Sequence, residues 1–255
     1  MRGIDRQNRG HLAERAAWVV QKDQGLNEQT LSMRLERVAA HVPAGARLAD
    51  IGSDHGYLPV ALMLRGRIEH AVAGEVALTP FHSAQRKVRK HGLEQQVSVR
   101  LADGLAAIEP ADRITTVSIC GMGGETMCEI LQRGKHYLSG AERLIFQPNG
   151  GERELRTWLM ENGYQIEQEE LLRENRFDYE IIVAVPGAGS AYSAEQLFFG
   201  PRLLQARSEA FQAKWRRVLR QRQQTLAHFE HAQAVPQDKA REFSKQVEWI
   251  TQVLG

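Results

Sequence analysis

One segment of the chain, ADIGSDHGYLPVAL at residues 49–62, gathers two aspartates, a histidine and two glycines just after an apolar run. Carboxylates and an imidazole can accept hydrogen bonds, hold a cationic ligand or move a proton. Glycines let the backbone turn tightly and let a ligand approach it closely. The composition therefore predicts a ligand-binding turn at the end of a buried strand.

The glycine spacing of this turn differs from that of loops that bind a pyrophosphate. Gly52 and Gly56 are separated by three residues, so the G-x-G-x-x-G fingerprint is absent, and no Lys-Ser/Thr pair follows as in a phosphate-binding loop. Asp50, at the end of the apolar run, favours a cationic or amine-bearing ligand. S-adenosylmethionine is such a ligand, because it carries a sulfonium and an ammonium group.

Acidic residues also end the next two predicted strands. Glu75 is suited to accept hydrogen bonds from two ribose hydroxyls, and Asp103 to accept one from an adenine amino group. The fourth apolar run ends in CGMGG, where missing side chains leave room for a ligand. A single acid at a strand end is more often a helix cap or a solvated loop residue. Three of them in register predict the cofactor site of a class I methyltransferase, because ligands bind at the carboxyl ends of parallel strands.

The elements that must position these residues alternate along the chain. Five apolar runs between residues 46 and 149 have the pattern of strands, and helical patterns separate most of them. Two further β-rich runs, at 164–174 and 179–185, predict a terminal hairpin with one antiparallel strand. The expected fold class is α/β, a Rossmann-like sheet covered on both faces by helices.

Helical segments flank this region. Helical spacing predicts N-terminal helices within residues 1–42, and a Gly/Ser-rich break at 186–193 precedes a helical tail. The tail carries two narrow apolar stripes: Phe211, Trp215, Leu219, Leu226 and Phe229, then Phe243, Val247, Ile250 and Leu254. These stripes predict an antiparallel, coiled-coil-like helical hairpin. We therefore expect a methyltransferase domain over 1–187 and a helical coiled-coil domain over 192–255.

The composition is typical of a soluble globular protein, with 42% hydrophobic and 25% charged residues. The sequence has neither a membrane-spanning apolar run nor a secretory signal. Its two cysteines, Cys120 and Cys128, make neither a disulfide framework nor a paired zinc site. We expect a reduced, cytoplasmic protein with no membrane partner and no metal; the oligomeric state stays open, with a monomer favoured.

Charge is distributed unevenly although the net charge is only +2. From Tyr192 onward there are ten Lys or Arg residues against six Asp or Glu residues. This surplus is consistent with an anionic partner, and on charge alone a solvated helix surface explains it at least as well.

Several motifs occur in a specific order: LSMRLERVAAHVP from residue 31, DIGSDH from 50, AGEV from 73, RLADGL from 100, GMGG from 121 and QPN from 147. Through them residues 31–185 resemble the bacterial tRNA (adenine-22, N1)-methyltransferase family, often called TrmK. Gly56 stands where that family is expected to have alanine. The resemblance implies methyl transfer from S-adenosylmethionine to adenine N1 of tRNA, at position 22.

Eight residues are the expected cofactor-binding set: Asp50, Gly52, Ser53, Glu75, Asp103, Gly104, Gly121 and Met122. Met122 is expected to pack on the cofactor adenine, and simple core filling is its alternative.

Three further residues are candidates for catalysis. Adenine N1 lies on the Watson–Crick edge, so the base must leave its stack. The neutral ring nitrogen keeps its lone pair, and catalysis then depends mostly on positioning. Asp54 is the expected carboxylate beside the exocyclic amine, where positive charge develops. His55 is expected to orient the base or relay a proton, or instead to bond backbone, and Asn149 to recognise the adenine edge.

The resemblance implies tRNA as the partner, held through its phosphates by basic side chains. The candidates are Arg216, Arg217, Arg220 and Arg222 in the tail, with Arg86, Lys87, Arg89 and Lys90 beside the cofactor site. Two alternatives remain open. One is a methyltransferase of the same fold that acts on another RNA nucleotide or a small molecule. The other is a non-catalytic nucleotide-binding module that recruits a partner through its coiled coil.

Overall fold

The structure, a computed structural model, describes residues 30–187, 191–230 and 237–255. The first of the predicted N-terminal helices falls outside these residues. Within them, no helix is long and apolar enough to span a membrane.

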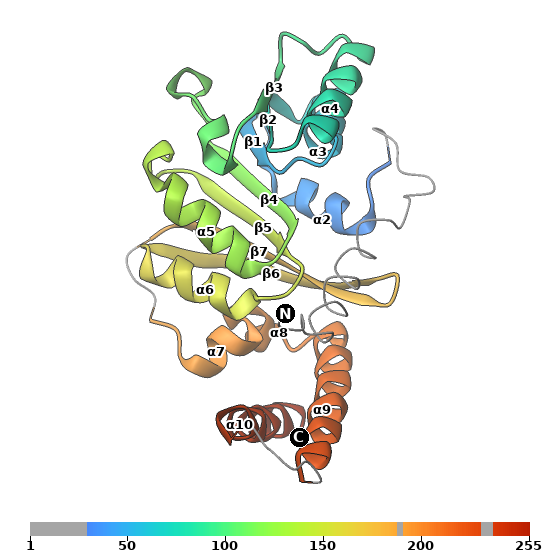
Figure 1. Cartoon of the computed structure of the whole chain (residues 1–255), viewed down its shortest axis with the longest axis vertical. Helices are drawn as coiled ribbons and strands as arrows, with labels where there is room; N and C mark the ends of the chain where they lie inside the picture. Colours follow the sequence, from blue (N-terminus) through green and yellow to red (C-terminus); the bar gives the residue numbers. More distant parts are fainter. Residues whose placement is uncertain (1–29, 188–190, 231–236) are drawn as a thin grey trace, which may run out of the picture.

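A seven-stranded sheet with the order β3-β2-β1-β4-β5-β7-β6 forms the centre of the molecule (Figure 1). Its strands are β1 (Ala46–Ile51), β2 (Ile68–Glu75), β3 (Val97–Leu101), β4 (Thr116–Met122), β5 (Arg143–Pro148), β6 (Tyr164–Glu174) and β7 (Phe177–Pro186). The first five strands are parallel, and β7 runs antiparallel to both β5 and β6. The Rossmann-like sheet and its terminal hairpin were both predicted, and both are confirmed.

Two apolar layers hold helices against the two faces of this sheet. On one face pack α2 (Met33–His41), α3 (Tyr57–Leu64) and α4 (Leu78–Lys90); on the other pack α5 (Gly124–Gly134) and α6 (Glu152–Glu161). Successive residues of β5 illustrate the division, because side chains alternate along a strand. Leu144 and Phe146 belong to the α5–α6 layer, whereas Ile145 belongs to the other layer. Short 3₁₀ turns at Gly104–Ala107, Pro110–Asp112 and Lys135–Tyr137 complete the connections.

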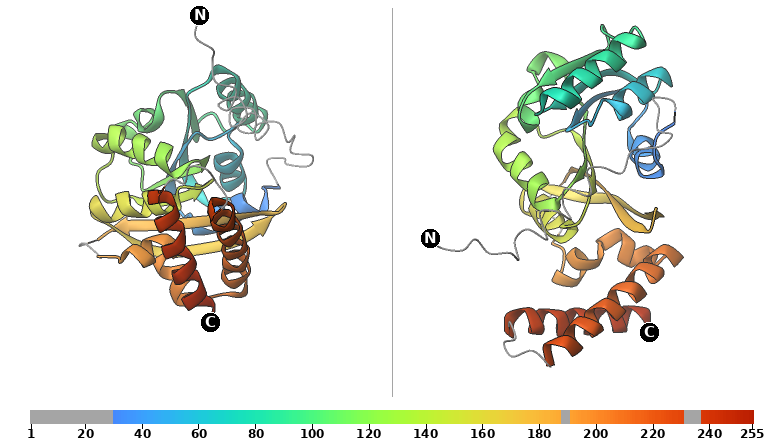
Figure 2. Two further views of the ribbon diagram at one scale, coloured as in Figure 1. Left: turned by 60° about the horizontal axis from the view of Figure 1, so that its bottom comes forward. Right: turned by 45° about the vertical axis from the view of Figure 1, so that its right-hand side comes forward.

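The tail forms a separate helical layer beside the β6–β7 hairpin. It comprises α7 (Ala194–Phe199), α8 (Pro201–Ala206), α9 (Glu209–Glu230) and α10 (Gln237–Leu254). Figure 2 shows α9 and α10 lying side by side, and a third apolar cluster joins them to α7 and α8. Phe211 and Trp215 of the first predicted stripe and Ile250 of the second are buried in this cluster. The coiled-coil geometry and the domain boundaries remain predictions.

A buried group of charges fastens the tail to the sheet. The guanidinium of Arg156 on α6 donates to Glu169 of β6 at 2.7 Å and also to Glu180 of β7. Lys214 of α9 pairs with the same Glu180 carboxylate, and the carbonyl of Leu197 accepts from Arg156 at 3.2 Å. The side chains of Arg156 and Glu169 are fully buried. The base of α9 is therefore docked on the sheet rather than held away from it.

Candidate functional site

The carboxyl ends of β1 and β2 meet around the segment that follows β1. The backbone N–H groups of Gly52 and Ser53 donate to the carbonyl of Gly74 at 2.9 and 3.2 Å. This contact fastens the turn to the last residues of β2. It brings Asp50 and Glu75, predicted from separate strand ends, into one site.

Asp50 is a buried carboxyl group that holds the turn against β4. Its side chain accepts from the hydroxyl of Ser53 at 2.5 Å and from that of Ser118 at 2.6 Å, and the residue is 3% exposed. Burial raises its pKa above the ordinary value of an aspartate. Sequence reasoning missed Ser118, because a serine within an apolar strand carries no signal of its own.

Asp54, His55 and Gly56 form a run of three left-handed residues, with φ of 46°, 71° and 72°. Residues other than glycine rarely adopt this backbone conformation, so contacts with neighbouring residues must hold it. The Glu75 carboxylate provides one, accepting from the backbone N–H of His55 at 3.1 Å. The run presents the Asp54 side chain, 79% exposed, with its carboxylate 3.4 Å from His55 Nε2. The side chains of Asp54 and His55, two of the three predicted catalytic residues, therefore lie close together at the carboxyl edge of the sheet.

Glu75 itself is 4% exposed. Burial, together with the nearby Asp50 and Asp54 carboxylates, raises its pKa to about 7. When a carboxyl group has a raised pKa, a ligand whose hydroxyl groups donate hydrogen bonds to it stabilises its charged form. The ribose-binding role of Glu75 stays a prediction, and a buried acceptor at this place fits S-adenosylmethionine, whose ribose hydroxyls can donate to it.

Asp103 and Gly104 follow β3, one strand farther from the turn. The Asp103 side chain is 62% exposed and pairs with Arg133 of α5 at 3.0 Å. Gly104 has a φ of 59° and opens a short 3₁₀ turn. The Asp103 carboxylate therefore lies at the surface of the same edge, with an arginine as its present partner.

Met122, at the end of the neighbouring strand β4, packs over the turn at residues 52–56, which we call the cofactor turn. Its methyl group lies where a Cβ at position 52 would stand, and the φ of 67° at Gly52 is a conformation that favours glycine. Gly121, with a φ of 73°, shapes the preceding bend. Met122 is partly buried and packs against the α5–α6 layer, so both interpretations of this residue, cofactor contact and core filling, remain compatible with its position.

Asn149 ties the end of β5 to the glycine-rich end of β4. Its side-chain amide donates to the carbonyl of Gly121 at 2.9 Å, and its backbone N–H donates to that of Met122 at 2.7 Å. Its side-chain carbonyl accepts from Gln147 at 3.0 Å. The residue is exposed, so it supports the loop and still borders the carboxyl edge of the sheet.

Arg34 is a site residue that sequence reasoning missed. It lies on α2 and donates from Nη1 to the buried Gln147 at 2.8 Å, across 113 residues of sequence. In the sequence it was one polar residue of an amphipathic helix, and only the packing of α2 on β5 and β7 reveals its place.

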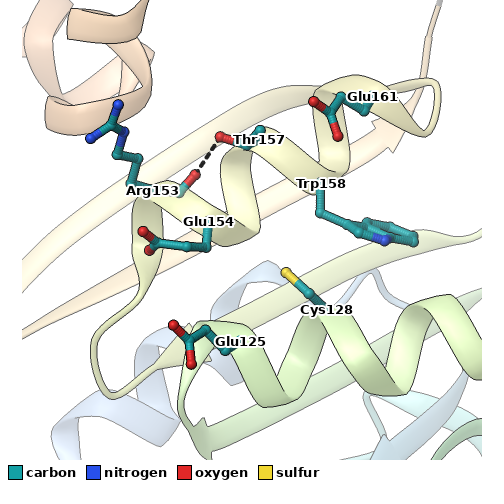
Figure 3. Close-up of a pocket in the computed structure, with 7 residues that line it drawn as sticks. All are labelled: Glu125, Cys128, Arg153, Glu154, Thr157, Trp158 and Glu161. Carbon is teal, nitrogen blue, oxygen red and sulfur yellow. Dashed lines mark hydrogen bonds between the residues drawn. The ribbon is translucent and has the colours of Figure 1, made fainter.

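A hollow of about 400 Å³ lies between α5 and α6 (Figure 3). It is lined by Glu125, Cys128, Arg153, Glu154, Thr157, Trp158 and Glu161. None of the predicted cofactor or catalytic residues lines it. Over the ranges that the structure describes, no group of three or more His, Cys, Asp and Glu side chains could hold a metal ion.

Comparison with known proteins decides the family. The family model of tRNA (adenine(22)-N(1))-methyltransferase, TrmK, matches residues 48–252. The Bacillus subtilis (strain 168) tRNA (adenine(22)-N(1))-methyltransferase is 38% identical over 236 residues, which cover 90% of this chain and 99% of that protein. The chain belongs to the TrmK family.

Solved structures agree with this TrmK assignment. A Streptococcus pneumoniae protein in complex with S-adenosyl-L-methionine is 40% identical, with a TM-score of 0.81 over 89% of this chain and 100% of that one. M. capricolum TrmK, in complex with S-adenosyl-homocysteine, is 25% identical, with a TM-score of 0.74 over 88% of this chain and 97% of that one. The resemblance inferred from the sequence motifs is confirmed.

Proposed function

We propose that this chain transfers the methyl group of S-adenosylmethionine to N1 of adenine 22 in tRNA. Membership of the TrmK family over residues 48–252 is the observation that carries this proposal. The edge of the sheet supports it, because buried carboxyl groups and glycine turns suited to the cofactor adjoin an exposed carboxylate suited to the substrate.

The cofactor would be held by residues at the ends of four adjoining strands, β3, β2, β1 and β4. When bound, it supplies an electrophilic methyl group on a sulfonium. Glu75 accepts hydrogen bonds from the ribose hydroxyls, and the backbone of Gly52 and Gly121 borders the ligand. Asp50 and Ser53 keep the turn in place through their hydrogen bond. Asp103, Gly104 and Met122 complete the proposed set, on the side where the adenine is expected.

Asp54 is the proposed catalytic carboxylate. Methylation leaves a positive charge that spreads from the adenine ring onto its exocyclic amine, and a nearby carboxylate stabilises it. Asp54 is exposed and lies in the cofactor turn, as this role requires. His55, within 3.4 Å of Asp54, is placed to orient the base or to pass on a proton, and Asn149 to border the adenine edge.

The tail would hold tRNA through exposed arginines on α9. Arg216 and Arg220 are exposed, whereas Arg217 pairs with Asp178 at 2.6 Å and Arg222 lies over the Phe243 ring at 4.1 Å. We therefore assign the phosphate contacts of α9 to the first two. Of the four arginines expected from the sequence, the other two have structural partners within the protein.

The substitution Asp54→Asn tests the catalytic assignment. Asparagine tolerates the left-handed conformation as aspartate does, so the turn is kept and only the charge is lost. We expect the single-turnover rate of methyl transfer to fall by about 100-fold or more. Cofactor affinity, measured by calorimetry, should stay within about twofold of the wild type because the cofactor contacts persist.

The matched control is Glu94→Gln, which neutralises an exposed carboxylate in the loop after α4. It should leave the rate unchanged. A wild-type rate in Asp54→Asn would remove Asp54 from the mechanism, and a collapse of cofactor affinity would assign it to the cofactor instead.

A further inference from the structure

Arg34 sits in the first turn of α2, and the backbone there is fixed to the β6–β7 hairpin. The N–H groups of Met33 and Arg34 donate to the Glu174 carboxylate at 2.7 and 3.3 Å. The hydroxyl of Ser32 caps the helix by accepting from the N–H of Leu35 at 3.4 Å. These contacts fix the position of the Arg34 backbone and so limit the positions that its guanidinium can occupy.

The guanidinium is held in a defined orientation at the ends of β4 and β5. Its Nη1 donates to Gln147, which is fully buried and therefore cannot move aside. Its Cζ lies 5.8 Å from the centroid of the Tyr179 ring, in cation–π range. Nη1 also lies 3.8 Å from the place of a Cβ on Gly121.

Arg34 keeps donors for a further acceptor. A guanidinium has five N–H groups, and among the described residues only Gln147 accepts from this one. Among the residues that the structure describes, no carboxylate lies within 4 Å of the Arg34 guanidinium. Arg37, three residues later in the same helix, differs because it pairs with Glu170 at 2.6 Å. A half-buried positive charge with unused donors is complementary to an anion.

The position of Arg34 indicates which anion. β4 pairs with β1, which precedes Asp54, and with β5, which precedes Asn149. The contacts of Arg34 with Gln147 and beside Gly121 therefore place its guanidinium at the edge where these two proposed substrate residues lie. An extruded adenine stays attached to its own backbone, so its phosphates must lie at the rim of the site that takes the base.

We propose that Arg34 binds a phosphate of the target nucleotide and so positions its base. This rests on the proposed function. Gln147 orients the guanidinium, and through Asn149 and the Gly121 carbonyl the same hydrogen-bond chain shapes the end of β4. One chain of contacts therefore joins the phosphate site to the loop that borders the cofactor.

The test compares Arg34→Met with Arg37→Met, which removes a guanidinium from the same helix at a carboxylate-paired position. The probe is a tRNA transcript with adenine at position 22. Arg34→Met should weaken tRNA binding by about tenfold. It should reduce the slope of log affinity against log salt by about 0.7 to 0.9, the value of one phosphate. Arg37→Met should change neither quantity.

Two further measurements make the result specific. Arg34→Lys should keep the salt slope but lose part of the methylation rate, because lysine lacks the forked geometry. Affinity for S-adenosylmethionine, measured by calorimetry, should be unchanged in Arg34→Met. Unchanged tRNA affinity and salt slope would overturn the proposal, and so would a loss of cofactor affinity, which would assign Arg34 to the cofactor carboxylate. Failure of the proposed function would be seen separately, as absent methylation by the wild type.

Discussion

Among single residues, the buried carboxyl groups at the ends of β1 and β2 do most to define the site. Asp50 is satisfied by two serine hydroxyls, and Glu75 accepts from the backbone of the left-handed turn. Burial raises the pKa of both. A ligand that donates hydrogen bonds to either group stabilises its charged form and so lowers that pKa.

This raised pKa predicts the pH dependence of stability. An unfolded glutamate titrates near 4.5, whereas Glu75 in the folded protein titrates at about 7. Between these values the folded state binds more protons, so the free energy of unfolding falls as pH rises, by about 3 kcal/mol for this group. Below pH 4.5 the stabilisation is complete, and above pH 7 it is lost. Denaturant unfolding of the cofactor-free protein from pH 5 to 8 measures the slope.

The variant Glu75→Gln isolates this contribution. It removes the titration and keeps an oxygen that can accept from His55, so its stability relative to the wild type should rise with pH across the same window. Asp50 adds a slope of the same sign in both proteins. Parallel pH profiles for the two proteins would contradict the assignment.

Between elements, the sequence did not reveal the buried charge group of Arg156, Glu169, Glu180 and Lys214. Removing one partner from a buried ion group leaves the others uncompensated, which costs about 3–5 kcal/mol. We expect Arg156→Met to lower the free energy of unfolding by that amount. The control is Arg153→Met, which breaks an exposed pair with Glu242 and should cost no more than about 1 kcal/mol. Denaturant unfolding measures both, and equal losses would mean that burial of the group contributes nothing.

The order of the elements was predictable because local signals produce it. Apolar runs ending in acids or glycines mark the parallel strands β1 to β4. The two closing β-rich runs, with no long helix between them, mark the antiparallel hairpin of β6 and β7. The acids at the ends of β1 and β2 were found in this way, and the structure unites them.

Contacts between distant segments were not predictable from one sequence. Arg34 and Gln147 are 113 residues apart, and neither breaks a periodic pattern. The left-handed turn at Asp54 and His55 is held by a hydrogen bond that the His55 N–H donates to Glu75 of β2, and Arg217 pairs with Asp178 on β7. Each of these facts arises from tertiary packing, which overrides the local pattern.

For the molecule as a whole, we expect the tail to contribute to the binding of tRNA. Exposed Arg216 and Arg220 lie one helical turn apart on α9, whose base is docked on the sheet. Each single reversal, Arg216→Glu or Arg220→Glu, should weaken tRNA binding and reduce its salt slope by about 0.7 to 0.9. Affinity for S-adenosylmethionine should not change, because the cofactor edge is left intact.

The control for these reversals is Lys135→Glu, at the far end of α5 from the cofactor turn. It changes the net charge equally and should leave the salt slope unchanged. Filter-binding titrations over a salt series make the comparison. Equal slopes in all three variants and the wild type would make the tail a packing element and would leave RNA binding to the sheet domain.

The central claim is methyl transfer to one ring nitrogen of one nucleotide, and reverse transcription reads it directly. A methyl group on N1 blocks Watson–Crick pairing, so the transcriptase stops where it meets the modified base. A tRNA transcript with adenine at position 22 is incubated with the wild-type protein and S-adenosylmethionine, beside a matched transcript with guanine there. We predict a new stop at adenine 22 that requires both protein and cofactor and is absent from the guanine transcript. A stop at another position, or the same stop on both transcripts, would contradict the account.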